Sequence, residues 1–390
     1  MKYEEAIDYL YHLPIFLGDR GLEMMKEGLK KFGNPEKELK IIHITGTNGK
    51  GSVGAMIQSI LQDAGYKVGF FTSPHLITLR ERIRINNRLI SEQELVDLFL
   101  KVKEKMPEMK FFEFVTLMSI IYFSEQKVDY VILEVGCGGT MDATNISDTP
   151  VISVITNVGL DHTHILGETV EEIAKDKSGI IKQGVPVVTA AKKPEILEII
   201  KSIAQKKDAK LIQASPSDYE TNLLGDFQRI NTGIAVATTK EIGIKDENIR
   251  DGLKHVQWPG RLQYLEKDFL VDGAHNVEGL EVLKKYIDSL DREVIIIFGF
   301  SGKRNAKELM KHFPKNKHLI FTQSESALVD MGQKKGLDPD SVDVDCKKIK
   351  DFRKAIEYAR SLQKNGELIL VTGSIYLVGD VMKELGASVE

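Results

Sequence analysis

A glycine-rich segment at residues 45–52, TGTNGKGS, has the residue types that bind phosphate groups. It follows an apolar run at 41–45 that predicts a buried strand, and it precedes a helical pattern at 53–63. Glycines let backbone amides turn toward an anion, and the N-terminus of a helix adds partial positive charge. Lys50 can reach the β- and γ-phosphates of a nucleotide, and Ser52 offers a hydroxyl to Mg²⁺. The segment therefore predicts a nucleotide-binding loop.

This loop departs from the common phosphate-loop pattern GxxxxGK[ST]. Its first glycine lies three positions before Gly49, and Gly51 stands where a Ser or Thr usually follows the lysine. The alternative interpretation is a glycine-rich turn with a surface lysine. The loop alone leaves ATP, GTP and a kinase open, although we find no NKxD-like base-reading motif of a GTPase switch. The candidate nucleotide-binding residues of the loop are Gly46, Thr47, Asn48, Gly49, Lys50, Gly51 and Ser52.

Acidic residues and a histidine follow two further predicted strands. Glu134 ends the apolar run 129–135, and the pair Asp161-His162 follows the run 151–158. Ligand sites in open parallel sheets lie beyond the carboxyl ends of the strands, and a carboxylate near a phosphate loop is a natural Mg²⁺ ligand. The alternatives are a capping or salt-bridged glutamate and a histidine that fixes a loop by hydrogen bonds.

Lys177 lies on the apolar face of its predicted helix, where a surface lysine is not expected. The sequence TVEE at 169–172 is a capping box that starts this helix. Lys177 then shares an i, i+3/i+4 row with Val170, Ala174 and Ile181. A buried ammonium is costly unless it is paired or neutralised, so the residue is either functional or an aliphatic stem that reaches water.

The elements that must position these groups alternate between strand and helix. An alternating order predicts a mostly parallel sheet covered by helices on both faces. We expect an α/β fold in which a P-loop-type ATPase domain, residues 1–256, precedes a smaller Rossmann-like α/β domain, residues 257–390. The join is placed near Trp258-Pro259-Gly260. Predicted strands are 41–45, 67–72, 129–135, 151–158, 269–272, 293–300, 318–322 and 367–372, and predicted helices are 53–63, 111–126, 277–289, 305–313 and 350–363.

Composition excludes several functional classes. The chain has 390 residues, with 53 Lys and Arg against 57 Asp and Glu, and a formal net charge of −4. It has no basic excess of the kind that marks a binder of nucleic acid or anionic membranes. Two cysteines, Cys137 and Cys346, are too few for a disulfide framework. No apolar run approaches the roughly 20 residues needed to span a bilayer, and no secretory signal is visible, so we expect a cytoplasmic protein.

A series of short motifs together resembles the folylpolyglutamate synthase/dihydrofolate synthase group of the Mur ligase superfamily. The motifs occur in family order and cover nearly the whole chain. They are TGTNGKGS (45–52), TSPHL (72–76), ERIRIN (81–86), LEVGCGGTMDATN (133–145), ITNVGLDH (155–162), IAKDKSGIIK (173–182), WPGR (258–261) and VDGAHN (271–276).

The resemblance implies an ATP-dependent ligase that joins L-glutamate to the γ-carboxylate of a folate through an acyl phosphate. Dihydropteroate is implied as a further acceptor. Lys50 and the loop amides would hold the phosphates. Ser52, Ser73, Glu134 and His162 would be metal ligands for Mg²⁺, which we expect to number two, with K⁺ as a further candidate ion. Lys177 matches the lysine that this superfamily carbamylates, and the carbamate would be an anionic ligand of the second Mg²⁺.

The resemblance also assigns residues to the nucleotide, the glutamate and the folate. Asn231 matches an asparagine near the adenine, although the family usually has Ala where Thr232 follows here. Arg261 and Asp272 match residues of the second domain that reach the nucleotide. His275 and Asn276 would lie at the domain cleft near the glutamate. Asp142, Phe112 and Arg82 are the candidates for the folate side. The alternative for Arg261, Asp272 and His275 is an interdomain hydrogen bond.

Two other functions remain open at this point. A Mur-type ligase of peptidoglycan precursors usually carries an extra N-terminal domain for the UDP-sugar, whereas about 40 residues precede the loop here. A nucleotide-dependent switch without ligase chemistry would release no phosphate in response to glutamate. The family's habit suggests a monomer whose partners are small molecules only.

Overall fold

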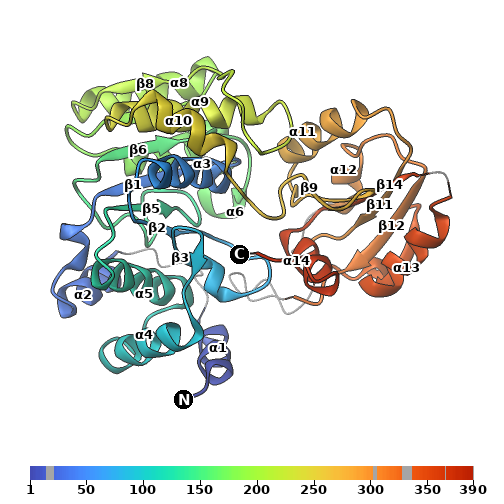
Figure 1. The fold of residues 1–390 in the computed structure, drawn as a ribbon, viewed down its shortest axis with the longest axis horizontal. Helices are drawn as coiled ribbons and strands as arrows, with labels where there is room; N and C mark the ends of the chain where they lie inside the picture. Colours follow the sequence, from blue (N-terminus) through green and yellow to red (C-terminus); the bar gives the residue numbers. More distant parts are fainter. Residues whose placement is uncertain (15–21, 302–304, 327–335, 365, 390) are drawn as a thin grey trace. The chain divides into compact units, whose positions relative to one another are not determined.

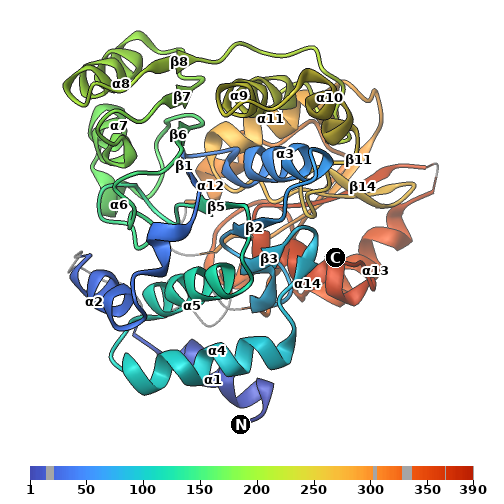
Figure 2. The same ribbon diagram turned by 60° about the vertical axis from the view of Figure 1, so that its left-hand side comes forward.

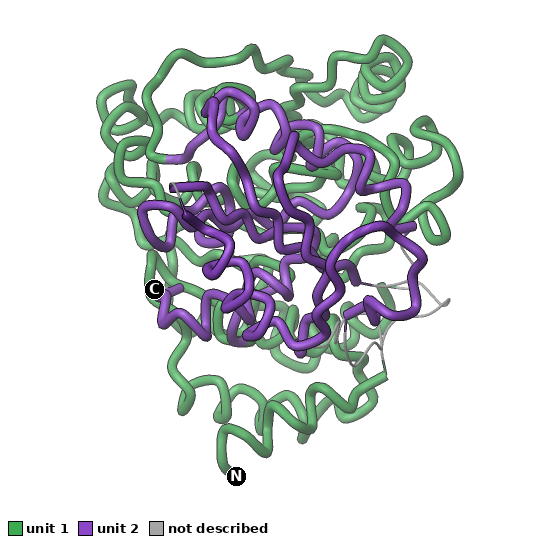
Figure 3. The backbone as a smooth tube through the Cα atoms, turned by 90° about the vertical axis from the view of Figure 1, so that its right-hand side faces the viewer, with its two compact units in different colours: residues 1–74, 79–222, 228–257 green, residues 75–78, 223–227, 258–390 purple. Residues whose placement is uncertain are grey.

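The computed structural model describes residues 1–14, 22–301, 305–326, 336–364 and 366–389. The chain forms two compact units (Figure 3). The first comprises residues 1–74, 79–222 and 228–257, and the second comprises 75–78, 223–227 and 258–390. The predicted α/β class is confirmed, since each unit has a parallel-dominated sheet with helices around it (Figure 1).

The first unit is built on an eight-stranded sheet of order β4-β3-β2-β5-β1-β6-β7-β8. Strands β2, β5, β1, β6, β7 and β8 pair in parallel, and β3 pairs antiparallel with both β2 and the edge strand β4. The strands are β1 Ile41–Thr45, β2 Val68–Phe71, β3 Ile83–Ile85, β4 Arg88–Leu89, β5 Tyr130–Glu134, β6 Ile152–Ile155, β7 Val187–Thr189 and β8 Leu211–Gln213. Because β1 lies between β5 and β6, the carboxyl ends of these three strands meet at one edge.

Helix α3, which follows the glycine-rich segment, packs against α9 and α10 (Figure 2). Helix α5 packs against α4 and α2, and α7 packs against α8. The helices are α1 Tyr3–His12, α2 Glu23–Lys31, α3 Lys50–Asp63, α4 Glu92–Lys105, α5 Phe111–Glu125, α6 Thr163–Leu166, α7 Val170–Lys177, α8 Pro194–Lys206, α9 Gln228–Glu241 and α10 Asp246–Lys254. Short 3₁₀ turns are η1 Pro35–Glu38, η2 Leu79–Arg82 and η3 Ser178–Ile180.

The second unit has a six-stranded sheet of order β13-β12-β11-β14-β10-β9, in which only β9 is antiparallel. Alternate residues of one strand enter two different cores: Ile296 packs in one, and Ile295 and Ile297 pack in the other. Both faces are therefore covered, which explains why these strands are continuously apolar. The elements are β9 Gln263–Glu266, β10 Phe269–Val271, β11 Val294–Phe298, β12 His318–Gln323, β13 Lys347–Asp351, β14 Leu368–Thr372, α11 Val277–Asp288, α12 Ala306–Met310, α13 Phe352–Leu362, α14 Ile375–Glu384 and the turn η5 Pro339–Ser341.

Most predicted elements are present, with corrected ends. Helix α3 begins at Lys50 and not at residue 53, because the glycine-rich loop turns directly into the helix at Gly49. Strand β6 ends at Ile155 and not at 158, because Thr156 and Asn157 turn to bond the glycine-rich loop. Helix α12 is shorter than the predicted 305–313. Among the helices of the described residues, none is long and apolar enough to cross a membrane.

Candidate active site

The glycine-rich loop of the first unit lies between β1 and α3, as its sequence predicts. Gly49 caps the helix with φ = 84°, a left-handed conformation that favours glycine. Lys50 opens the helix, and its Nζ donates to the carbonyl oxygen of Gly46 at 3.0 Å. Gly51 and Ser52 occupy the first turn of α3, and Ser52 is buried. The loop thus has the strand–loop–helix context that phosphate binding requires.

Residues 156–159, which follow β6, hold this loop in place. Asn157 accepts from the Asn48 amide through Oδ1 at 2.7 Å, and its carbonyl accepts from the Thr47 amide at 3.0 Å. The Thr156 hydroxyl donates to the Asn48 carbonyl at 2.6 Å. The Thr47 hydroxyl bonds Gly159 through both its amide and its carbonyl, at 3.0 and 3.1 Å. Sequence reasoning did not assign these roles, because nothing local connects residues more than 100 positions apart.

Asn231 lies against the helix end of the glycine-rich loop, and its place near the nucleotide stays a prediction. A Cβ atom added to Gly49 would lie 2.6 Å from Asn231 Oδ1, so no side chain fits there without a shift. Asn231 is part of α9 and is 8 % exposed, and its Nδ2 donates to Gln228 Oε1 at 2.8 Å. The asparagine is therefore held by its own helix beside the loop.

Glu134 ends β5 at the same sheet edge and is 4 % exposed. Its Oε2 accepts from the Thr72 hydroxyl and, at 3.3 Å, from the Ser73 amide. Carboxylate and hydroxyl oxygens are the donors that Mg²⁺ prefers, usually with substrate phosphates completing the shell. Glu134, Ser52 and Ser73 offer this donor set. Across the described residues, no three His, Cys, Asp or Glu side chains gather closely enough to hold a metal by themselves.

Lys177 is buried, as its helical row predicts, and it reaches the glycine-rich loop. The capping box is present, with Thr169 Oγ1 accepting from the Glu172 amide, and Lys177 ends α7 with 4 % exposure. Its Nζ donates to the Gly46 carbonyl at 2.9 Å, the same oxygen that Lys50 contacts. Burial and, to a smaller extent, the neighbouring charge of Lys50 lower the pKa of Lys177 to about 8.

His162 begins the short helix α6 in a left-handed conformation, with φ = 50°. A non-glycine residue in this conformation is uncommon and is often found at functional sites. The backbone amide of His162 donates to Asp161 Oδ1 at 2.9 Å. Asp161 also acts on Lys177, since its negative charge opposes the lowering of that lysine's pKa. Of the predicted pair, Asp161 thus belongs to the electrostatic surroundings of Lys177.

Asp142 organises the loop that follows Glu134. It is 7 % exposed, and its Oδ2 accepts from the amides of Gly136 and Cys137 at 3.1 and 3.0 Å. Its Oδ1 accepts from the Thr144 hydroxyl at 2.6 Å, and burial raises its pKa. Because the Thr144 hydroxyl donates its only hydrogen to Asp142, its oxygen must accept a hydrogen bond from His43 Nε2, which lies 2.9 Å away. This assigns the Nε2–H tautomer to His43, a residue that sequence reasoning missed.

The other two predicted folate-side residues, Phe112 and Arg82, lie close to this loop and to α5. A Cβ atom added to Gly136 would lie 2.6 Å from Phe112 Cζ, so the ring packs directly on the loop after Glu134. Arg82 is 1 % exposed, and its guanidinium lies 5.2 Å from the centroid of the Phe111 ring. The backbone carbonyl of Arg82 accepts from the Thr72 amide at 3.1 Å.

In the second unit, Arg261 and Asp272 come together after β10. Asp272 is 6 % exposed, and its carboxylate accepts from the amides of Leu262 and Ala274, both at 2.9 Å. Burial raises the pKa of Asp272, and the charge of Arg261 opposes this rise. A Cβ atom added to Gly273 would lie 3.0 Å from Arg261 Nη1, so the guanidinium lies close against this glycine.

His275 and Asn276 follow in the same segment. His275 Nδ1 lies 2.8 Å from the Gly273 carbonyl, which can only accept, so Nδ1 carries the proton. Asn276 caps α11, because its Oδ1 accepts from the Gly279 amide at 2.9 Å. The cap gives Asn276 a structural task beyond its predicted contact with substrate.

Comparison with known proteins agrees with this geometry. The model of the Mur ligase middle domain matches residues 44–234, and that of the Mur ligase glutamate ligase domain matches residues 260–375. A dihydrofolate synthase/folylpolyglutamate synthase of Bacillus subtilis is 34 % identical, over 98 % of this chain and 99 % of its own. The chain belongs to the folylpolyglutamate synthase group of the Mur ligases. The middle-domain match contains the glycine-rich loop, Glu134, His162 and Lys177.

Solved structures of folylpolyglutamate synthases share the fold over the full length. The enzyme of Thermotoga maritima has a TM-score of 0.83 at 33 % identity, covering 98 % of this chain and 96 % of that one. A complex of such a synthase with AMPPCP and folate has a TM-score of 0.84 at 30 % identity, covering 99 % and 100 %. Arg261 and Asp272 fall within the glutamate ligase domain that this Mur ligase shares with its relatives.

Proposed function

We propose that this chain joins L-glutamate to the γ-carboxylate of a reduced folate with the hydrolysis of ATP to ADP and phosphate. The observation that carries the proposal is the convergence of Lys50 and Lys177 on one carbonyl oxygen, that of Gly46. The Lys50 ammonium at this point would attract the phosphates of ATP, and Lys177 lies where its carbamate could hold a metal ion beside them. A folate ligase must bring two anions together, namely the phosphates of ATP and a carboxylate.

The reaction has two steps. An oxygen of the folate γ-carboxylate attacks the γ-phosphorus, the bond to the β–γ bridging oxygen breaks, and ADP leaves. The neutral amine of glutamate then attacks the acyl carbon of the acyl phosphate, loses a proton and expels inorganic phosphate. Lys50 and the amides of residues 49–52 at the start of α3 bind the transferring phosphate, because aligned donors stabilise charge that develops in the transition state. Thr156 and Asn157 hold the preceding part of the loop, at Asn48, in position.

We assign Ser52, Ser73 and Glu134 to one Mg²⁺, and His162 with a carbamylated Lys177 to a second, with K⁺ as a further candidate ion. When bound, Mg²⁺ neutralises phosphate charge and so lowers the repulsion between the reacting anions. Glu134 is already oriented for this role by its bonds from Thr72 and Ser73.

Burial of Lys177 favours its carbamylation. Only a neutral amine attacks CO₂, and a pKa of about 8 leaves a larger neutral fraction near pH 7 than an ordinary lysine has. The amine forms a C–N bond to CO₂ and loses a proton, which converts a cation into an anionic ligand with two oxygens. Carbon-13 NMR with labelled bicarbonate should show a carbamate signal that is absent from Lys177→Met. Clear density for an unmodified ammonium in a nucleotide–Mg²⁺ complex would contradict this assignment.

The remaining residues keep their predicted roles as proposals. Asn231, Arg261 and Asp272 would contact the nucleotide. Asp142, Phe112 and Arg82 would serve the folate side, with Asp142 acting through the loop it organises. His275 and Asn276 would serve the glutamate, and the proposed tautomer leaves His275 Nε2 able to accept a proton.

Phosphate release with ATP and glutamate tests the function. The assay compares tetrahydrofolate, dihydropteroate and a UDP-muramoyl substrate as acceptors. We expect release with tetrahydrofolate, and also with dihydropteroate, because the Bacillus subtilis relative carries both names. Release with the UDP-muramoyl substrate alone would identify a ligase of peptidoglycan precursors. Nucleotide binding without glutamate-dependent release would identify a switch. Sedimentation of the purified chain tests the proposed monomer.

A further inference from the structure

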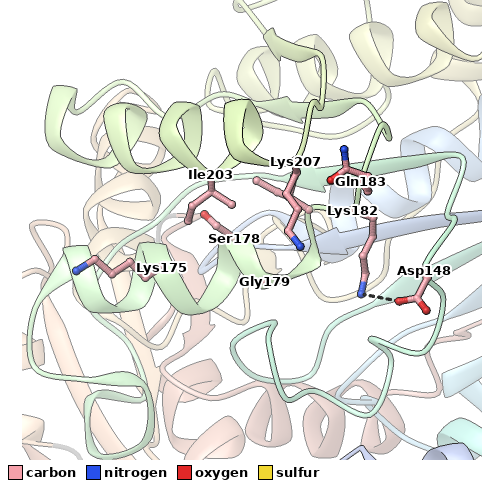
Figure 4. A pocket seen from close by; sticks show the side chains of 9 residues that line it. Asp148, Lys175, Ser178, Gly179, Lys182, Gln183, Ile203 and Lys207 are labelled. Carbon is pink, nitrogen blue, oxygen red and sulfur yellow. Dashed lines mark ion pairs between the residues drawn. The ribbon is translucent and has the colours of Figure 1, made fainter.

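A hollow of about 390 Å³ lies in the first unit, on residues that the proposed reaction does not use. The segment 178–183 and the end of α8 form much of its wall, and Asp148 lies at its side (Figure 4). Ser178, which lines the hollow, directly follows Lys177 in the chain. Lys177 itself reaches Gly46 in the glycine-rich loop and does not line the hollow. Adjacent residues of this turn therefore contact the glycine-rich loop and line the hollow.

The charges around this hollow are unbalanced. Lys175, Lys182 and Lys207 line it, and Asp148 is the only acidic residue among the lining residues. The Lys182–Asp148 ion pair measures 3.8 Å, and the Asp148 side chain is fully exposed, so water screens it strongly. In the part of the chain that the structure describes, Lys207 forms no ion pair. Figure 4 shows the amino groups of Lys182 and Lys207 pointing into the same region, while that of Lys175 points away.

The positive charge of Lys182 is destabilised by burial and by neighbouring lysines. Its side chain is only 16 % exposed. Burial lowers its pKa, and the positive charges of Lys207 and of Lys26 in α2 lower it further, against the opposing effect of Asp148. Lys26 has its own partner, Glu23, at 3.8 Å. A half-buried ammonium beside a second ammonium thus lacks an adequate counter-charge within the described residues.

We propose that this hollow is a second anion site, which binds a small, multiply charged anion between Lys182 and Lys207. Lysines recognise charge and not the planar shape of one group, and no arginine is found among the described residues that line the hollow. The ligand chemistry is therefore two or more negative charges close together. Phosphate groups and the carboxylates of a γ-linked glutamate chain both provide it. The site is separate from the glycine-rich loop, so it does not depend on the proposed ligase reaction.

The wall of the hollow is continuous with the support of Lys177. Asn145 Nδ2 donates to the carbonyls of Thr140 and Gly179, at 3.0 and 3.3 Å. The Thr140 amide and hydroxyl both donate to the Asp176 carbonyl, at 3.0 and 2.8 Å. An anion that fixes residues 178–183 would therefore also fix the end of α7, and with it the position of Lys177.

Calorimetric titration tests the site in the intact chain saturated with AMPPCP and Mg²⁺, so that the glycine-rich loop is already occupied. One arm adds inorganic phosphate, and the other adds γ-linked triglutamate. We expect at least one arm to show binding that weakens about tenfold in Lys182→Met and in Lys207→Met, since each variant removes one charge–charge contact. Lys175→Met is the matched control, because it keeps the hollow but changes an amino group that points away.

The results of the two titrations distinguish a phosphate-bearing ligand from a glutamate chain, and they can overturn the proposal. Lysine-dependent binding of phosphate alone identifies a phosphate-bearing ligand, binding of triglutamate alone identifies a glutamate chain, and binding of both shows recognition of charge only. Absence of binding in both arms overturns the site, as does binding that Lys182→Met and Lys207→Met leave unchanged. Thermal unfolding of each variant confirms that it is folded, and we expect Lys182→Met to be no less stable than the parent chain.

Discussion

The two units build their sites at strand ends in different ways. In the first, the candidate groups come from distant segments: Lys177 bonds Gly46 across 131 positions, and Asn157 bonds Asn48 across 109. In the second, the side-chain bond of Asp272 reaches Leu262 only 10 positions away, although the backbone of the same segment also bonds β14. Long-range ties make the first site dependent on the fold of the whole unit. Short-range bonds place the Asp272 carboxylate of the second within one segment, which β14 supports through its backbone.

Substitution of Lys177 should have the largest effect on the site of the first unit, which is built from distant segments. We expect Lys177→Met to lower ligase activity by about 10³-fold, a loss of the size seen when one preorganised electrostatic group is removed. Stability of the chain without bicarbonate should not fall, because the unmodified Lys177 is a buried ammonium that Lys50 repels and that the variant removes. Steady-state phosphate release and thermal unfolding measure the two effects. Lys175→Met on the exposed face of α7 is the control, and equal losses in both variants would refute a special role for Lys177.

Asn157 tests the ties that hold the glycine-rich loop. Asn157→Ala removes the acceptor of the Asn48 amide but keeps the backbone bond to Thr47. We expect ATP to bind about tenfold more weakly, because the loss of this bond loosens the loop that leads into the phosphate-binding amides at the start of α3. Nucleotide titration measures this change. Asn248→Ala, which removes an exposed hydrogen bond to Asp63, is the control. Unchanged ATP affinity in Asn157→Ala would show that the loop is stable without this tie.

The same difference explains what the sequence could predict. Gly46 to Ser52, Glu134 and Lys177 were identifiable because strand ends, a capping box and helical periodicity are local patterns, and family motifs added the rest. His43, Thr72, Thr156 and Asn157 were not, since their roles exist only once β1, β2, β5 and β6 lie side by side. Strand β6 was predicted too long for this reason: Thr156 and Asn157 look like strand residues, but their bonds to the loop bend the chain away.

The edges of the fold were harder to predict than its centre. Antiparallel edge strands such as β4 and β9, with two and four residues, carry little apolar signal of their own. Central strands such as β11 are apolar at every position because both faces are covered, and they were predicted within one or two residues. Segments 75–78 and 223–227 belong to the second unit, although the first unit surrounds them in sequence. Only three-dimensional contact can show such an assignment.

The hydrogen bonds that connect His43 through Thr144 to Asp142 can be tested by varying the pH. Burial lowers its pKa to about 3, from an unperturbed value of 6.5. Between these values the unfolded chain binds a proton that the folded chain does not, so the free energy of unfolding falls as the pH falls. His43 contributes a slope of up to about 1.4 kcal/mol per pH unit. We expect His43→Gln to flatten the urea-unfolding profile between pH 6.5 and 4 while still donating to Thr144.

The control for His43 separates titration from hydrogen bonding. His43→Leu removes both, so it should share the flatter profile but lose stability and activity at pH 7, since Thr144 and the Asp142 loop lose a donor. A profile in His43→Gln as steep as that of the parent chain would mean that another group titrates. Equal activity of His43→Leu and His43→Gln at pH 7 would mean that the chain to Asp142 does not position the loop after Glu134.

Substitution of Asn276 should have the smallest effect, and it tests the site of the second unit. Asn276→Ala removes the cap of α11, and we expect the free energy of unfolding to fall by about 1 kcal/mol. Asn276→Asp keeps an acceptor for the Gly279 amide and should restore that stability, because a carboxylate caps a helix as well as an amide does. If Asn276 also binds glutamate, as proposed, neither variant should restore the KM for glutamate, since aspartate adds a negative charge and alanine removes the amide. A normal KM in Asn276→Asp would leave Asn276 with its cap alone, and the second unit's segment would then depend on Arg261, Asp272 and His275 for its contacts with substrate.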